Sequence, residues 1–273
     1  MKIDLHTHSR YSDGSESLEA LFQQAKAAGI SHLGVVDHDT TKHHEEGRQL
    51  ARQYEMTFIP GVEISAYDFK RKRKVHMLGY GFRGACPAIN ALCKPLLARR
   101  HAHSLWQLAC IQNAGFNVKE EDALQFAHIS GTLYKQHIMN ALIEESYDEK
   151  NYQALYRSLF KGAGVAAGDI YYIDALEALQ AIKKDGGIAV IAHPGQLDSF
   201  DIAEELVREG LDGIEYVHPD HTATHRERIE KLADKYDLLL TGGSDFHGKY
   251  GSTVQLGQYL AKDLPNIDLL MKC

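Results

Sequence analysis

The sequence predicts an α/β fold in which about seven strands, most of them parallel, form a barrel-like sheet. Three observations indicate this fold. Short apolar runs alternate with helical patterns in the first and last parts of the chain, helical patterns alone occupy residues 85–173, and histidines or carboxylates follow most of the apolar runs. The 273 residues are 44% hydrophobic, which is enough for one large core.

The predicted barrel elements follow one another in a regular order. Strands are expected where apolar residues alternate or run together, at residues 3–5, 32–36, 57–63, 75–80, 188–192, 213–217 and 238–241. Helices are expected between them, at residues 18–28, 42–54, 174–184, 201–209 and 222–236. Ser17 and Asp174 can cap two of these helices, and Gly29 can end the first.

Residues 85–173 are predicted to be an inserted helical subdomain between a first barrel segment, residues 1–84, and a second, residues 174–273. Its helices are expected at residues 89–112, with Pro95 as a potential break, and at 119–127, 134–145 and 151–160. An insertion this long exceeds an ordinary barrel connection. We therefore expect it to act as a lid or to select the substrate.

A run of basic residues at positions 70–74, after Phe69, separates two predicted strands and is interpreted as the solvated tip of a hairpin. The sharper alternative is a contact with nucleic acid. The chain holds 30 basic and 37 acidic residues, and its formal charge is −7. This charge argues against a protein that coats nucleic acid, so no stable nucleic-acid partner is expected.

Imidazoles and carboxylates gather at the ends of the predicted strands. In a parallel barrel those ends meet at one mouth, where active sites form. Taken singly, each is explained by a buried or surface polar residue, but together they indicate a site for two or three ions. Ligation by nitrogen and oxygen without sulfur suits zinc, manganese or iron. The candidate ligands are His6, His8, Asp13, His38, Glu63, His76, His193, Asp245 and His247.

At this point the sequence resembles the polymerase and histidinol phosphatase (PHP) family of metal-dependent phosphoesterases. The motifs that carry the resemblance occur in the family's order over nearly the whole chain. They are His6-Thr7-His8 with Ser12-Asp13-Gly14, Asp37-His38-Asp39, Gly61-Val62-Glu63, Val75-His76, Ala192-His193-Pro194 and Ser244-Asp245-Phe246-His247.

The resemblance implies a distorted seven-stranded (β/α)7 TIM-like barrel that holds three divalent ions, manganese, zinc or iron. By that analogy three groups of residues each hold one ion, and Glu63 is shared by two of them. The first group is His6, His8, Glu63 and Asp245, the second is Glu63, His76 and His193, and the third is Asp13, His38 and His247.

The sequence is most similar to stand-alone family members with a helical insert, which remove phosphate from 3',5'-nucleoside bisphosphates or trim RNA from its 5' end. In those relatives an insert motif resembling Gly-Arg-Pro-His contacts phosphate. Here Lys135 and His137 occupy the arginine and histidine positions, and lysine lacks the two-pronged guanidinium. Arg99 and Arg100 in the long helix are further candidate phosphate anchors, with a solvated helix face as the alternative.

The expected chemistry is in-line attack on phosphorus by a hydroxide that bridges two of the ions. His218, which follows another strand, is a candidate to protonate the leaving oxygen or to bind phosphate, with a buried structural role as the alternative. Asp37 and Asp39 flank His38 and are expected to orient ligand imidazoles.

The expected partner is therefore a small phosphorylated substrate, a nucleotide or a short RNA end. One alternative is a phosphatase for a small metabolite such as histidinol phosphate. A non-enzymatic, metal-binding regulatory module is a third reading, but it would have lost ligands, and all nine are present. Hydrolysis of a C–N bond is disfavoured, because no lysine that could carry a bridging carbamate stands at a strand end.

The remaining features predict a cytoplasmic protein with no membrane association. No apolar run approaches the ~20 residues of a membrane span, and a cleaved signal peptide would remove His6. The four cysteines, Cys86, Cys93, Cys110 and Cys273, have neither metal-site nor disulfide spacing, which favours reduced thiols.

Overall fold

The computed structural model describes residues 1–262, 264, 267 and 270 of the chain. Seven strands form one path in the order β1, β2, β3, β4, β6, β7 and β8, and β5 pairs with β3 beside it. The strands are β1 Ile3–Asp4, β2 His32–Val35, β3 Thr57–Asp68, β4 Arg73–Tyr80, β5 Ile173–Asp174, β6 Ile188–Ile191, β7 Gly213–Val217 and β8 Leu239–Gly242.

The two ends of this path meet and nearly close the sheet into a barrel. The backbone N–H of Leu5 donates to the carbonyl oxygen of Gly242 at 3.2 Å, and Thr7 forms a parallel bridge with Phe246. Apolar side chains point inward from the strands and fill the interior, as the inside of a small closed barrel requires. These include Leu5, Val36, Leu78, Val190 and Leu239. The predicted seven-stranded TIM-like barrel is confirmed.

Strand β4 departs from the parallel order. It pairs antiparallel with β3 on one side and with β6 on the other. The cause is the tight turn at residues 69–72, which returns the chain directly beside β3 without the crossover helix that a parallel strand needs. This hairpin is the distortion in the barrel.

The basic residues at the hairpin tip reach solvent, as expected, and most of them also pair with carboxylates of the protein. Each pair joins a tip residue to a nearby carboxylate at 2.5–2.9 Å. The pairs are Lys70–Glu205, Arg71–Asp68, Arg73–Asp198 and Lys74–Asp169. Because these charges are compensated, the tip offers little attraction to a phosphate backbone.

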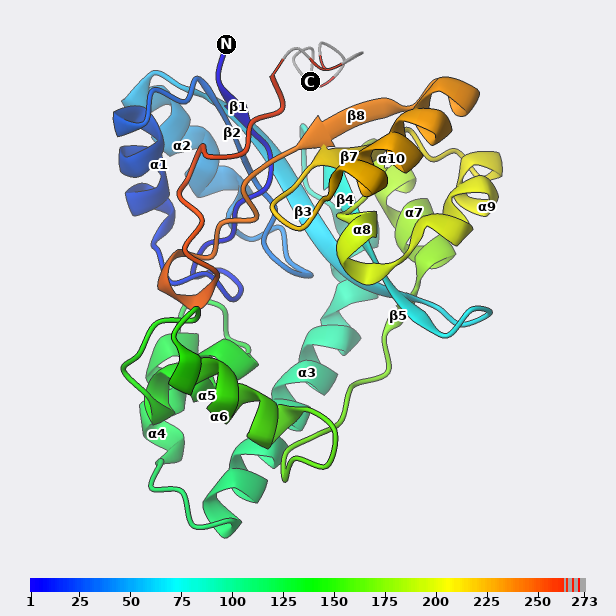
Figure 1. The fold of residues 1–273 in the computed structure, drawn as a ribbon. Helices are drawn as coiled ribbons and strands as arrows, with labels where there is room; N and C mark the ends of the chain where they lie inside the picture. The colour runs from blue at the N-terminus through cyan, green and yellow to red at the C-terminus, as the bar shows by residue number, and fades with distance from the viewer. Residues whose placement is uncertain (263, 265–266, 268–269, 271–273) are drawn as a thin grey trace.

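Helices cover the outside of the barrel (Figure 1). They are α1 Leu18–Ala27, α2 His44–Tyr54, α7 Ala175–Lys184, α8 Pro194–Leu197, α9 Ala203–Arg208 and α10 Ala223–Tyr236, with short 3-10 turns η2 Phe200–Ile202 and η3 Gly248–Tyr250. The predicted caps form: the side chains of Ser17 and Asp174 accept backbone N–H groups at the starts of α1 and α7.

Between β4 and β5 the chain forms helices that lie as a lobe on one side of the barrel (Figure 1). They are α3 Pro87–Asn113, α4 Glu120–Leu124, η1 Gln125–Ala127, α5 Lys135–Leu142 and α6 Lys150–Phe160. The lobe has its own apolar cluster, which includes Leu108, Ile138 and Leu159. The expected break at Pro95 is wrong, because α3 runs continuously through it. The division of the chain into three domain segments stays a prediction.

Two further expectations concern the whole chain. In the described part of the chain every helix is too short or too polar to cross a bilayer. Cys86, Cys93 and Cys110 are free thiols, and Cys273 lies outside the described residues.

Candidate metal centre and active site

The structure brings the nine predicted ligands together at one mouth of the barrel. Three overlapping sets of side chains have ligand atoms within 4.8 Å of one another. The sets are His6, His8, Glu63 and Asp245; His8, Asp13, His38 and His247; and His38, Glu63 and His76. The first matches the predicted first ion group, and the second contains the predicted third group.

Glu63, from the middle of β3, lies at the centre of the cluster. Its Oε1 lies 2.6 Å from His76 Nδ1 and 2.8 Å from His193 Nε2, which is the predicted second ion group. Its Oε2 lies 3.2 Å from the Nε2 atoms of both His6 and His8. Burial alone would raise the pKa of Glu63, but the surrounding imidazoles hold that pKa well below its usual range.

Asp13 forms the opposite edge of the cluster. Its Oδ1 lies 3.5 Å from His247 Nε2, and its Oδ2 lies 3.8 Å from His38 Nε2. The neighbouring Gly14 is required here, because a Cβ at that position would lie 2.3 Å from the carbonyl oxygen of His8. The Asp-Gly pair therefore lets the loop after β1 fold back and bring this carboxylate to the histidines.

The donor atoms of the cluster fit divalent cations. Both ring nitrogens of the fully buried His8 lack a hydrogen-bond partner, and so do His38 Nδ1 and His193 Nδ1. Buried polar atoms are seldom left unpaired in proteins. Ring nitrogens that have no hydrogen bond and lie among carboxylate oxygens are satisfied when cations lie between them.

The sequence reasoning missed Glu215, a fully buried carboxylate on β7. Its Oε1 lies 2.9 Å from His6 Nδ1, and its Oε2 accepts the backbone N–H of His193 at 2.7 Å. Carboxylates that hold the second nitrogen of a ligand imidazole fix its orientation and tautomer. An acidic residue inside an otherwise apolar strand was the signal in the sequence.

The expected role of Asp37 and Asp39 is wrong, because neither contacts an imidazole of the nine. Asp37 accepts hydrogen bonds from the Ser9 and Ser12 side chains and lies 3.2 Å from His43. Asp39 accepts the backbone N–H of Ser65 and pairs with Arg100 at 2.9 Å. These aspartates hold the loops that carry the ligands, and not the ligands themselves.

His218 lies beside the cluster, and its hydrogen bonds define which ring nitrogen carries the proton. The backbone N–H of Asp220 donates to its Nδ1 at 3.1 Å, so the proton of the neutral ring is on Nε2. Nε2 faces Asp245 Oδ2 at 3.2 Å. A nitrogen that carries a proton cannot bind a metal, but it can donate that proton.

Two cavities adjoin the cluster and share three of its residues, Asp13, His38 and His76, together with two glutamines. The first, about 430 Å³, also contains Glu63, His193 and His218. The second, about 320 Å³, lies against the helical lobe and is lined by Lys74, Arg100 and Lys135 among others. Burial lowers the pKa of Lys135 to about 8. The metal cluster therefore opens on one side into a basic compartment.

Two of the predicted phosphate anchors lie elsewhere. Arg99 is exposed, and its Nε donates to the carbonyl oxygen of Tyr171 instead of facing either cavity. His137 is fully buried, and its Nδ1 accepts the backbone N–H of Tyr134 at the start of α5. Arg99 thus holds the segment that leaves the lobe, and His137 caps a helix through Nδ1. Neither residue lines the two cavities, and their phosphate contacts stay a prediction.

The PHP domain model matches residues 4–215, which span most of the barrel and the lobe. The chain belongs to the PHP domain family. The resemblance drawn from the motifs is thereby confirmed, and this PHP protein is a metal-dependent phosphoesterase, an enzyme that hydrolyses phosphoric esters. The clustered imidazoles and carboxylates suit divalent metals.

The relatives of this PHP protein cover nearly its whole length. A phosphoribosyl 1,2-cyclic phosphate 1,2-diphosphodiesterase from Eggerthella lenta is 48% identical over 93% of this chain and 97% of its own. A 5'-3' exoribonuclease from Haemophilus influenzae is 30% identical over 95% of this chain and 94% of its own. A structure attributed to a metal-dependent phosphoesterase from Bifidobacterium adolescentis is 27% identical, with a TM-score of 0.86 over 96% of this chain and 92% of its own.

Proposed function

We propose that this PHP protein is a phosphodiesterase for a small cyclic phosphate ester that carries a second phosphate, of the phosphoribosyl 1,2-cyclic phosphate type. The observation that carries the proposal is the pair of adjoining cavities. One contains the clustered imidazoles and carboxylates, and the other is lined by Lys74, Arg100 and Lys135. A substrate with two phosphate groups can place one group in each cavity.

The basic compartment supports this placement through Lys135. Its ammonium lies over the ring of Phe160, 5.8 Å from the centroid, and has no ion pair with any residue that the structure describes. Arg100 and Lys74 are already paired, with Asp39 at 2.9 Å and Asp169 at 2.6 Å. Lys135, whose side chain is half-buried, is therefore the cation available to a terminal phosphate.

The nine clustered residues are proposed to hold three divalent ions, manganese, zinc or iron, with Glu63 shared between two of them. Such ions supply water that deprotonates near neutral pH and neutralise charge on the phosphoryl oxygens. The protein's own part is to hold the ions through Glu63 and Asp13, so that the phosphodiester would bind against them in a closed site. Both carboxylates are buried, so the charges around them act in a medium of low dielectric constant.

His218 is proposed to donate a hydrogen bond from Nε2 to the oxygen that leaves phosphorus. When the P–O bond to the sugar breaks, that oxygen carries the negative charge. The hydrogen bond stabilises this charge and lowers the barrier to departure, and water then supplies the proton. Asp245, 3.2 Å from Nε2, stabilises the ring in the donor orientation. The backbone N–H of Asp220 keeps the proton on Nε2.

A second candidate substrate is a nucleotide or the 5' end of a short RNA. The specific observation in its favour is that Tyr156 and Tyr172 line the basic compartment beside Lys135. Aromatic rings stack on nucleobases with little sequence preference. The exoribonuclease relative supports this reading, although at lower identity than the diphosphodiesterase.

The test compares substrates on the manganese-loaded protein. We expect kcat/KM for phosphoribosyl 1,2-cyclic phosphate to exceed, by about tenfold or more, the values for adenosine 3',5'-bisphosphate, histidinol phosphate and a 5'-phosphorylated RNA. The cyclic ester without its terminal phosphate should react poorly, and Lys135→Ala should remove the difference between the two cyclic esters. A higher kcat/KM for the bisphosphate or the RNA would overturn the proposed substrate.

A further inference from the structure

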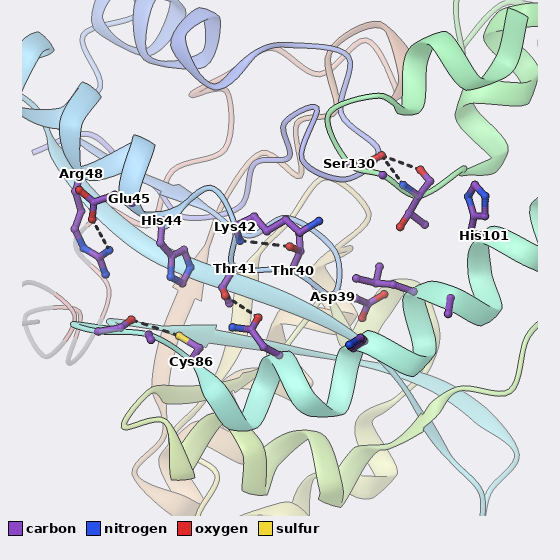
Figure 2. A pocket seen from close by; sticks show the side chains of 18 of the residues that line it. Asp39, Thr40, Thr41, Lys42, His44, Glu45, Arg48, Cys86, His101 and Ser130 are labelled. Carbon is purple, nitrogen blue, oxygen red and sulfur yellow. Dashed lines mark hydrogen bonds and ion pairs between the residues drawn. The ribbon is translucent and has the colours of Figure 1, made fainter. Parts of the chain in front are cut away.

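A third cavity, of about 890 Å³, lies between the barrel and the lobe against another face of α3 (Figure 2). From the barrel it is lined by residues 39–42 and the start of α2, and from the lobe by residues 130–132. Among the described residues, it shares no lining residue with the two cavities at the metal cluster. Its size is that of a small-molecule site.

Cationic side chains surround this cavity, and two of them lack a partner. Lys42, Lys94, Arg48 and Arg83 all line it. The ammonium groups of Lys42 and Lys94 make no hydrogen bond or ion pair with any residue that the structure describes, whereas Arg48 donates to the carbonyl oxygen of Phe82. The cavity therefore presents uncompensated positive charge although the chain as a whole carries −7.

The acidic residues of the lining do not cancel this charge. The Asp39 carboxylate is engaged by Arg100 at 2.9 Å, and Glu45 lies on the exposed side of α2, 3.8 Å from Arg48. The first turn of α3 is capped by Asp185, whose oxygens accept the N–H groups of residues 88 and 89. An anion in the cavity would thus be held by the lysines and not by the helix start.

Neutral groups complete the lining. Thr41 donates to the amide oxygen of Asn90 at 3.0 Å, which leaves the Asn90 amide NH2 without an acceptor in the described part of the chain. His101 Nδ1 accepts the N–H of Leu133, so the proton of the neutral ring is on Nε2. Leu97 and Ala98 supply apolar surface from α3 between these donors.

We propose that this cavity is a second binding site, separate from the catalytic one, for a nucleotide-like molecule in which a phosphate is joined to an aromatic or apolar body. Lys42 and Lys94 bind the phosphate. Leu97 and Ala98 contact the apolar body, and the Asn90 amide and His101 Nε2 donate to its polar edge. The combination of free cations, directed donors and apolar wall matches that chemistry better than it matches an inorganic ion alone.

The test uses the metal-loaded, full-length protein and the fluorescent aromatic sulfonate 1-anilinonaphthalene-8-sulfonate as the probe. We expect saturable binding of one molecule, at least about tenfold weaker in Lys94→Glu and in Ala98→Trp. The matched controls are Lys184→Glu, an exposed lysine at the end of α7, and Ala109→Trp, an exposed alanine farther along α3. Both controls should bind the probe as the parent does.

Competition defines the ligand class. AMP should displace the probe, whereas adenosine and inorganic phosphate at the same concentration should not. Equal displacement by adenosine and AMP, or unchanged binding in both Lys94→Glu and Ala98→Trp, would overturn the proposal. A second copy of this chain is the alternative occupant of the cavity, and sedimentation of the parent and of Ala98→Trp tests it. A parent that is a dimer, with a monomeric Ala98→Trp, would make the cavity an interface between two copies and would overturn the proposal. Thermal unfolding of each variant verifies that it is folded.

Discussion

Glu215 Oε1 lies 2.9 Å from His6 Nδ1, and both side chains are completely buried. Glu215→Gln keeps the shape of the side chain but replaces one carboxylate oxygen with an amide NH2. An NH2 group cannot accept the His6 N–H, so it no longer fixes the orientation of His6 as a ligand. We expect about 10–100-fold weaker metal binding, measured by competition with a chelator. The matched control is Glu230→Gln on α10, which neutralises an exposed carboxylate that accepts the Tyr216 hydroxyl. A variant with parental metal affinity would remove Glu215 from this role.

Asp245→Ala, and likewise His193→Ala, should abolish turnover while leaving the far-ultraviolet circular dichroism largely unchanged. Asp245 Oδ1 lies 3.2 Å from His6 Nε2 and 3.3 Å from His8 Nε2, so its removal opens the first ion group. Ligands that bind only the folded state raise its stability. A chelator should therefore lower the Tm of the parent and change that of Asp245→Ala much less. Turnover equal to the parent's would contradict the assignment.

Lys135→Ala should raise KM more than it lowers kcat, because the lysine is proposed to bind a phosphate that does not react. Burial lowers the pKa of this lysine to about 8, so its charge is present below that pH and lost above it. For the parent, KM should rise as the pH passes from about 7 to 9. For Lys135→Ala this rise should be absent. A larger effect on kcat than on KM would exclude the binding role.

His218→Asn should slow the hydrolysis of esters with poor leaving groups by about 10²–10⁴-fold. An ester with a good leaving group, such as p-nitrophenolate, needs no proton at that step, so its kcat should change little. This comparison separates a proton donor from a histidine that is only structural. Equal losses for the two kinds of ester would point to a structural role.

The metal cluster was predictable from the sequence because its members share one rule of position. Each follows or belongs to an apolar run, and strand ends in a barrel meet at one mouth. Glu63, His76 and His193 converge although they are widely spaced along the chain, because β3, β4 and β6 are neighbours in the sheet. The pattern of apolar runs in the sequence and the order of the strands in the sheet therefore predict the same cluster.

The sequence could not reveal contacts that depend on side-chain direction. The resemblance placed His137 at a phosphate, but its ring turns back to the N–H of Tyr134 and caps α5. Arg99 and Arg100 are adjacent in α3 and therefore point about 100° apart around the helix axis. Arg100 pairs with Asp39, whereas Arg99 donates to the carbonyl oxygen of Tyr171. Spacing alone does not distinguish the two.

The lobe also contacts the metal cluster directly, since Gln136 of α5 donates to Asp13 Oδ2 at 2.9 Å and Tyr134 donates to the carbonyl oxygen of His38 at 3.4 Å. Gln136, the residue beside the candidate phosphate anchor, thus contacts a carboxylate of the proposed metal ligands. Exchanging the insert between relatives would therefore alter ion occupancy together with substrate preference. A new substrate specificity in this barrel would therefore require compensating changes around Asp13 in addition to a new insert.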